Sequence, residues 1–330
     1  MKKKNKAIYL LFLMPFVYFA TACFVVWLVK TSGIYPSGSD TMYHVYRGDY
    51  VYNAIKSGNW YPLYDPAWYN GVEILRYWSP FPAYVMAFCQ YLAGGSQFGA
   101  YLFYIGGVCF LGACVWPFIG RGFNRPYLGA FIGLLWFFMP NNLCAIFIEG
   151  NLARSLSMIF LPVFIYSVYK YLYNHKLRYI PLMVFTFLLM ELCHLGYAGM
   201  VAIAVIIYGI VYIIQKGRKK AVLDVVISMI FGFMLLGIWL VASLRGGITS
   251  LDNSENMANF FQNLWITINP FERLTRGFEY FYFGFATLVV IVFGILFGYK
   301  KSRTGFVTGF IILLMTTKSA YAVLKHLPGS

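Results

Sequence analysis

The chain has 330 residues, of which 60% are hydrophobic and 11% are charged, whereas soluble domains carry roughly 25% charged residues. This composition excludes an ordinary soluble protein and predicts an all-α polytopic membrane protein, a single transmembrane domain over residues 1–330 with no separate soluble domain. The net charge of +15 does not indicate a nucleic-acid partner, because the basic residues form short clusters between apolar runs.

The N-terminus carries four lysines ahead of an apolar run from Ala7 to Val29. This pattern resembles a signal peptide, but the run is long enough to cross a bilayer and no small-x-small cleavage site follows it. We predict an uncleaved first span with a cytoplasmic N-terminus, because basic residues favour the cytoplasmic side.

Residues 30–98 are then predicted to form the first extracytoplasmic loop. Its last apolar run, Phe81 to Ala93, would extend only roughly 20 Å as a helix, which is too short to cross the bilayer. We predict a juxtamembrane or re-entrant helix there. If this run were a span, every later assignment would violate the positive-inside rule.

Eight further apolar runs bring the predicted total to nine spans: Gly99–Gly120, Tyr127–Ile146, Leu152–Val168, Ile180–Leu195, Tyr197–Ile214, Ala221–Val241, Phe281–Phe297 and Thr304–Thr317. Residues 180–214 are too long for one span, so a hairpin is expected near His194. This threading puts most basic residues inside and every carboxylate except Asp224 outside. Chemistry is therefore expected on the extracytoplasmic face of the plasma membrane, unless longer outer loops simply collect more acids.

The first outer loop offers a candidate catalytic pair. Pro36 and Gly38 break the chain, Ser39 or Asp40 can cap a helix, and His44 would lie one turn from Asp40 on the same face. Asp40 could accept a proton from a hydroxyl nucleophile or bind a divalent cation such as Mg²⁺ or Mn²⁺. The alternative is that Asp40 only caps the helix and His44 only faces the interface.

Other polar residues stand at the outer ends of predicted spans. Asp65 lies in a segment dense in Trp, Tyr and Pro, which suits either the headgroup level or stacking on sugars. A second list of candidates comprises Glu149, Asn151, Arg154, Glu191, His194, Arg273 and Arg276. Arg154 is a natural phosphate ligand, although Glu149 and Arg154 could also simply pair with each other.

The order of these motifs resembles one family. The Gly38-Ser-Asp-Thr-x-x-His44 loop, the Pro62-Leu-x-Asp-Pro66 segment, the Tyr77–Pro82 turn and the Glu149-Gly-Asn-Leu-Ala-Arg154 turn carry the resemblance. They are similar to the bacterial and archaeal membrane proteins labelled 6-pyruvoyl-tetrahydropterin synthase-related, within the GT-C glycosyltransferase superfamily. The pterin part of the label implies nothing here, because the sequence has no zinc-ligand histidine cluster.

The resemblance implies a GT-C-like bundle, a polyprenyl-phosphate-linked sugar donor, juxtamembrane helices before the second span, and a catalytic carboxylate in the first outer loop, which Asp40 matches. His44 would assist Asp40, and Arg154, Arg273 and Arg276 would hold the donor phosphate. Glu149, Asn151, His194 and Asp65 are further expected substrate contacts, and Glu191 would line the cavity. The expected partners are the lipid bilayer, the polyprenyl-phosphate sugar and an extracytoplasmic acceptor of unknown identity.

Two rival functions stay open at this level. A transporter or flippase of an anionic lipid or solute would need polar residues through the bilayer and often internal repeats, and neither is visible. A non-catalytic membrane scaffold is the other rival. Members of the family are typically longer, so a truncated gene product is a further alternative.

Overall fold

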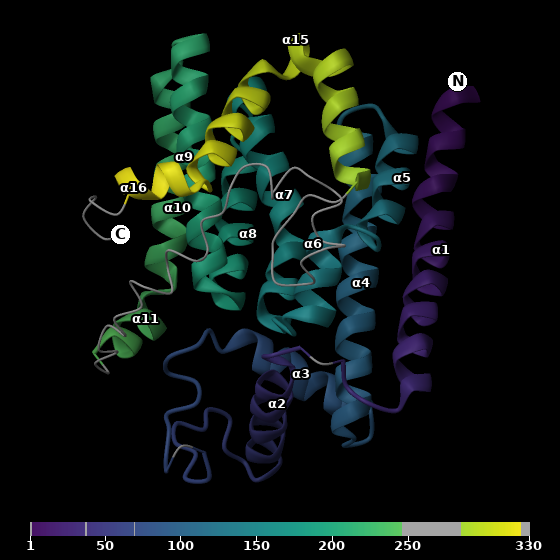
Figure 1. Ribbon diagram of the computed structural model, residues 1–330, viewed down its shortest axis with the longest axis vertical. Helices are drawn as coiled ribbons and strands as arrows, with labels where there is room; N and C mark the ends of the chain where they lie inside the picture. Colours follow the sequence, from purple (N-terminus) through teal and green to yellow (C-terminus); the bar gives the residue numbers. More distant parts are fainter. Residues whose placement is uncertain (1, 37, 69, 246–284, 325–330) are drawn as a thin grey trace. The chain divides into compact units, whose positions relative to one another are not determined.

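The computed structural model describes residues 2–36, 38–68, 70–245 and 285–324 (Figure 1). Helices account for 80% of the structure, and no strand forms within those ranges. Five helices are long and apolar enough to cross a membrane, and a bent pair would make a sixth. The predicted all-α membrane protein is thereby confirmed.

The chain divides into two compact units, Met1–Gly199 with Leu223–Gly246, and Met200–Val222 with Gly247–Ser330. The single-domain organisation stays a prediction. All of the residues that build the candidate site described below belong to the first unit.

Helices and short helical turns form the body of this first unit. They are α1 (Lys2–Ser32), α4 (Gln97–Gly122), α5 (Pro126–Trp136), α6 (Pro140–Leu143), the π-helical turn η1 (Cys144–Ile148), α7 (Leu152–Asn174) and α8 (Tyr179–Cys193). Helix α4 packs against α1, α5 and α7, and α7 packs against α8. Buried side chains of α1 and α4 meet in the core, where the Tyr18 hydroxyl donates to Ala130 O at 2.8 Å.

Residues 30–98 contain two short helices, α2 (Thr41–Lys56) and α3 (Phe81–Leu92), that pack on each other. Both helices lie at the end of the bundle where α4 begins (Figure 1). The predicted short helix after Phe81 is confirmed, and so is the predicted helix after Asp40. A separate apolar cluster of Val51, Ile74, Leu75, Ala83 and Ala87 gives this loop region a core of its own.

The later helices are α9 (Leu195–Lys216), α10 (Lys219–Leu235), α11 (Gly237–Leu244), α15 (Phe285–Met315) and α16 (Lys318–Leu324). A helix break at His194 is confirmed, because α8 ends at Cys193 and α9 begins at Leu195, and the hairpin itself stays a prediction. Helices α10 and α11 bend by 66° at Leu236, within the predicted span Ala221–Val241. Helix α15 holds a non-helical Ser302 between two predicted spans. The count of nine spans stays a prediction.

The two ends of the first unit differ in charge. At the end opposite α2 and α3, Lys170 of α7 donates to Gly122 O of α4 at 2.5 Å and lies 4.4 Å from the Phe123 ring centroid. Arg121, Arg125 and Arg178 lie at the same ends of α4, α5 and α8. Asp40 and Glu149 lie at the other end, which also holds the cations Arg47, Arg76 and Arg154 and so carries both charge types.

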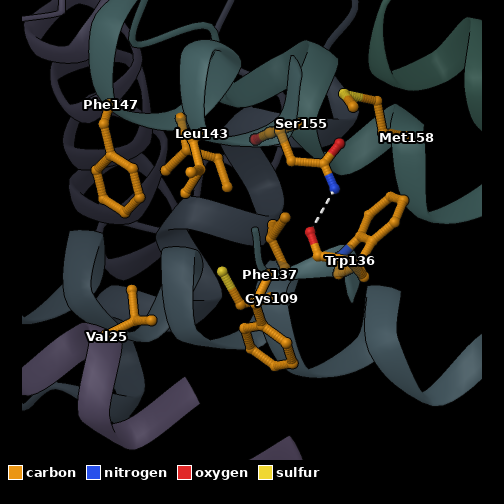
Figure 2. A pocket seen from close by; sticks show the side chains of 11 residues that line it. Val25, Cys109, Trp136, Phe137, Leu143, Phe147, Ser155 and Met158 are labelled. Atoms are coloured by element: carbon orange, nitrogen blue, oxygen red, sulfur yellow. Dashed lines mark hydrogen bonds between the residues drawn. The ribbon is translucent and has the colours of Figure 1, made fainter. Parts of the chain in front are cut away.

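A small pocket lies among α1, α4, α5, η1 and α7 (Figure 2). Its volume is about 20 Å³, and most of its lining is apolar, including Val25, Cys109 and Phe137. Asn142 donates to Trp136 O at 2.8 Å in the same place. This volume suits one water molecule and is far too small for a lipid-linked substrate.

Candidate functional site

The start of α2 docks onto the turn between η1 and α7. The Asp40 backbone N–H and the Ser39 hydroxyl both donate to Glu149 O, each at 3.0 Å. Gly150, with φ of +67°, lies so close that a Cβ atom would stand 2.2 Å from Thr41 Oγ1. Only glycine combines this backbone conformation with so close an approach.

The Asp40 side chain is not used to cap α2. Asp40 occupies the N-cap position, but its carboxylate makes no capping hydrogen bond, and its Oδ1 lies 3.2 Å from Ser39 Oγ, whose single proton is shared with Glu149 O at 3.0 Å. The residue is partly exposed. The carboxylate therefore keeps lone pairs available for a ligand, and the alternative in which it serves as a side-chain cap does not describe this structure.

Glu149 and Arg154 form a two-pronged ion pair. Arg154 Nη1 lies 2.7 Å from Glu149 Oε2 and Nη2 lies 2.9 Å from Oε1, while the Cys144 thiol donates to Oε1 at 3.4 Å. The Arg154 side chain is 16% exposed and the Glu149 side chain is 22% exposed. Bidentate geometry strengthens such a pair, so most of the Arg154 charge is already balanced by Glu149.

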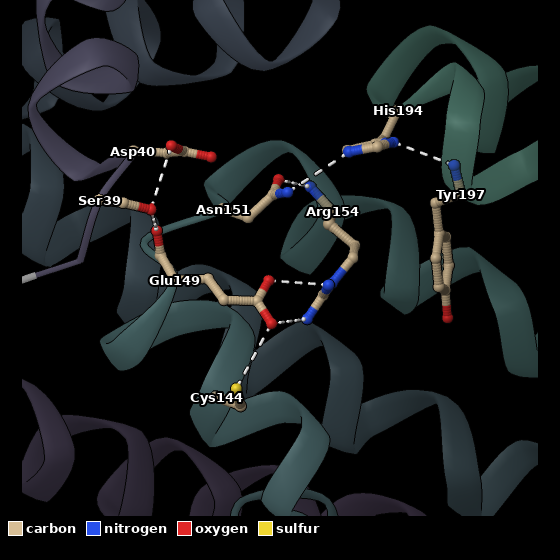
Figure 3. A network of polar contacts seen from close by, with 8 residues as sticks. All are labelled: Ser39, Asp40, Cys144, Glu149, Asn151, Arg154, His194 and Tyr197. Atoms are coloured by element: carbon tan, nitrogen blue, oxygen red, sulfur yellow. Dashed lines mark hydrogen bonds and ion pairs between the residues drawn. The ribbon is translucent and has the colours of Figure 1, made fainter. Parts of the chain in front are cut away.

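Asn151 and His194 join this cluster from the start of α7 and the break between α8 and α9. Asn151 Oδ1 accepts from the Arg154 backbone N–H at 3.0 Å, which caps α7. Asn151 Nδ2 lies 3.4 Å from His194 Nε2, and His194 Nδ1 accepts from the Tyr197 backbone N–H at 3.0 Å. Figure 3 shows Asp40, Asn151 and His194 along one side of the Glu149–Arg154 pair.

The two histidines differ in their surroundings. His44 is buried on α2, and burial, together with the Arg47 and His194 charges, lowers the pKa of His44 to about 3. His194 is only partly buried; burial and then Arg154 lower its pKa, whereas the Asp40 and Glu149 carboxylates act in the opposite direction. Both rings are thus neutral at pH 7, and His194 is the imidazole more open to a ligand.

The Asp65 side chain stabilises a turn in the loop. Its carboxylate accepts from the Tyr46 hydroxyl at 2.6 Å and from the Ala67 backbone N–H at 2.9 Å, and its backbone pairs with Val72. These contacts tie residues 65–72 to α2. Its predicted contact with substrate stays a prediction.

The remaining predicted residues fall in two places. Glu191 is 2% exposed near the end of α8, its Oε2 has no hydrogen-bond partner, and its backbone oxygen accepts from Ser79 Oγ at 2.9 Å. It therefore lies under the loop region 30–98. Arg273 and Arg276 lie outside the described residues.

Sequence reasoning missed Arg47. This side chain is 1% exposed, and its Nη2 donates to Trp78 O at 3.2 Å and to Ser79 O at 3.4 Å, which fastens α2 to the segment before α3. Its position three residues after His44, on the same face of the predicted helix, was the available signal. Ser39, considered only as a cap, is the second missed contact.

Asp40 is also the candidate ligand for a divalent metal ion. Among residues 2–36, 38–68, 70–245 and 285–324, no three His, Cys, Asp or Glu side chains come close enough to hold one. Asp40 offers one carboxylate, and the carboxylate of Glu149 is held by Arg154. The predicted role of Asp40 as a ligand of Mg²⁺ or Mn²⁺ stays a prediction.

Comparison with known proteins gives one match. A family model described as a 6-pyruvoyl-tetrahydropterin synthase related domain of a membrane protein matches residues 75–330. The chain belongs to this family. No curated protein and no solved structure matches the chain.

The family match covers only part of the candidate site. Glu149, Asn151, Arg154 and His194 lie within the matched residues, whereas Asp40 comes before them.

Proposed function

We propose that this membrane protein is a GT-C-like glycosyltransferase of the plasma membrane, which moves a sugar from a polyprenyl-phosphate carrier to an extracytoplasmic acceptor. Family membership supports the membrane setting. The observation that carries the proposal is the Asp40 carboxylate, which stands at a helix start without capping it, beside Asn151, His194 and the Glu149–Arg154 pair.

In the proposed reaction, Asp40 is the general base. A hydroxyl oxygen of the acceptor attacks the anomeric carbon of the donor sugar and forms the new C–O bond, while its proton passes to the Asp40 carboxylate. The bond between the anomeric carbon and the phosphate oxygen breaks, and polyprenyl phosphate leaves with the electron pair. The proton later passes from Asp40 to water.

The leaving phosphate needs cationic partners. Arg154 presents one further donor, because its buried Nε–H has no hydrogen-bond partner while both Nη groups face Glu149. Arg273 and Arg276 lie outside the described residues, and their role as phosphate ligands stays a prediction from the sequence. Charge-assisted hydrogen bonds to phosphate are among the strongest in proteins, so these groups would stabilise the leaving group.

The test is transfer of radiolabelled sugar from a panel of polyprenyl-phosphate donors by the purified full-length protein in lipid vesicles. Label that moves from the lipid carrier to an added glycan or lipid acceptor supports the transferase. The Asp40→Asn variant should lose this transfer. Its matched control is Glu73→Gln, which removes a loop carboxylate that pairs with Arg76 and lies outside the Asp40 cluster, and this control should transfer normally.

The same vesicles distinguish the rival functions. Donor that crosses the bilayer with its sugar still attached would indicate a flippase. Neither transfer nor crossing with any donor would reject the proposed activity and favour a scaffold role.

A further inference from the structure

Two hydrogen-bond donors of the site point at each other. Asn151 Oδ1 is used by the Arg154 backbone N–H, so the amide NH₂ of Asn151 must face His194. His194 Nδ1 accepts the Tyr197 backbone N–H, so the proton of the neutral ring must be on Nε2. The contact of 3.4 Å between Asn151 Nδ2 and His194 Nε2 therefore joins two N–H donors and is not a hydrogen bond of its own.

One acceptor atom that lies close to both nitrogens can satisfy these two converging N–H donors. An oxygen with two lone pairs satisfies both N–H groups, and both residues are partly exposed, so a ligand can reach them. The Asp40 carboxylate lies beside the pair, as its influence on His194 and Figure 3 indicate. This site thus offers two donors next to one strong acceptor.

A hydroxyl group fits this pattern better than a phosphate does. A hydroxyl oxygen accepts from both N–H groups while its own proton is donated to Asp40. The phosphodiester of the sugar donor has no proton to give at neutral pH and would be repelled by Asp40, while Arg154 beside it is already paired with Glu149.

We propose that Asn151 Nδ2 and His194 Nε2 together bind a hydroxyl oxygen of a carbohydrate and turn its proton toward Asp40. This inference rests on the proposed function, since it assigns the position of the reacting hydroxyl within the same site. Asn151 and His194 are then positioning residues for the nucleophile, and a neutral sugar rather than an anion occupies this part of the site.

The first step of the test is the tautomer of His194. The chain has four histidines, so ¹⁵N-histidine labelling of the full protein in lipid gives a simple imidazole spectrum, and His194→Gln identifies the His194 signals. We expect a protonated Nε2 and an unprotonated Nδ1 at pH 7. A protonated Nδ1 would overturn the proposal, because Nε2 would then accept from Asn151.

The second step titrates methyl glycosides, farnesyl phosphate and inorganic phosphate separately against the His194 Nε2 signal. We expect a saturable shift with at least one methyl glycoside, weakened about tenfold in Asn151→Asp, which keeps the α7 cap but replaces one donor with an acceptor. The control Asn141→Asp makes the same change at an exposed residue of α6 and should bind as wild type does.

Each other outcome contradicts the proposal. A shift with farnesyl phosphate or inorganic phosphate but with no glycoside would mean that the pair binds an oxyanion. No shift with any probe would mean that the donors bind no ligand of either class. Because glycoside binding is measured without turnover, it can succeed even where sugar transfer fails, so the two proposals are separable.

Discussion

Two ion pairs of the protein, one inside the candidate site and one outside it, differ in their exposure to water. The Glu149–Arg154 pair is mostly shielded from water, whereas Glu73 and Arg76 form a pair with side chains 36% and 28% exposed. Breaking a shielded pair leaves an uncompensated charge, but breaking an exposed pair costs little.

We therefore expect Glu149→Gln to lower the free energy of unfolding by about 2 kcal/mol, and Glu73→Gln by less than about 1 kcal/mol. Thermal unfolding in lipid nanodiscs measures both. If the two variants lose the same stability, the Glu149–Arg154 pair is not the structural clamp described above.

Burial of neutral His44 predicts a dependence of stability on pH. Its pKa falls from 6.5 in the unfolded chain to about 3 in the fold, so below pH 6.5 the unfolded chain binds a proton that the native protein does not. The free energy of unfolding then decreases as the pH falls from 6.5 toward 3, by about 2 kcal/mol at pH 5.

His44→Gln should remove this part of the acid sensitivity. The measurement is the difference in unfolding midpoint between pH 7 and pH 5, which should be larger for wild type than for the variant. Equal differences would show that His44 titrates normally and is not buried in its neutral form.

Among the elements, the junction between α2 and the η1–α7 turn determines the geometry of the site. Gly150→Ala would force a Cβ atom against Thr41 Oγ1 and Thr41 N, at 2.2 Å and 2.6 Å, in addition to the strain of a positive φ. Gly33 has a similar φ of +69° but open space around it.

We expect Gly33→Ala to cost about 1 kcal/mol of unfolding free energy, and Gly150→Ala to cost clearly more, about 3 kcal/mol. Limited proteolysis should also cut residues 30–98 faster in Gly150→Ala only. Equal losses in the two variants would mean that the turn has room to relax and that the junction is not tightly packed.

Local signals were enough to predict α2 and α3. A chain break before Asp40 and an apolar run too short to span are both visible in the sequence, and both helices form close to the predicted bounds. The contact of Gly38 and Thr41 with Gly150 was not predictable, because it joins residues more than a hundred positions apart through backbone atoms. The Glu149–Arg154 pair joins residues only five positions apart and was one of the alternatives that the sequence left open. Burial of Arg47 was harder to predict, because its partners Trp78 and Ser79 are more than thirty positions away.

Across the molecule, predicted apolar runs form helices in the described residues, whereas the count of nine spans stays a prediction. Helix α8 is apolar but has 15 residues, and α10 and α11 are separated by a bend of 66°, so neither meets a simple length criterion. The basic residues Arg121, Arg125 and Arg178 at one end of the first unit favour that end as the cytoplasmic one, and we therefore propose that residues 30–98 lie outside the cytoplasm.

That orientation predicts opposite labelling of two exposed sites. In intact cells, Asn59→Cys in the first loop should react with a membrane-impermeant maleimide, whereas Lys176→Cys between α7 and α8 should react only after lysis. Wild type controls for labelling of the native cysteines, of which Cys23 is exposed in the structure. Labelling of Lys176→Cys alone in intact cells would invert the proposed topology.

The central claim is that the Asp40 carboxylate performs the chemistry without holding the fold together. The measurement is the rate of sugar transfer by Asp40→Asn beside wild type, with unfolding midpoints recorded on the same samples. Asn is an equally good N-cap and Asp40 makes no side-chain cap, so we predict an unchanged midpoint with a loss of rate of at least about a hundredfold. A folded Asp40→Asn protein that transfers sugar at the wild-type rate would contradict the account.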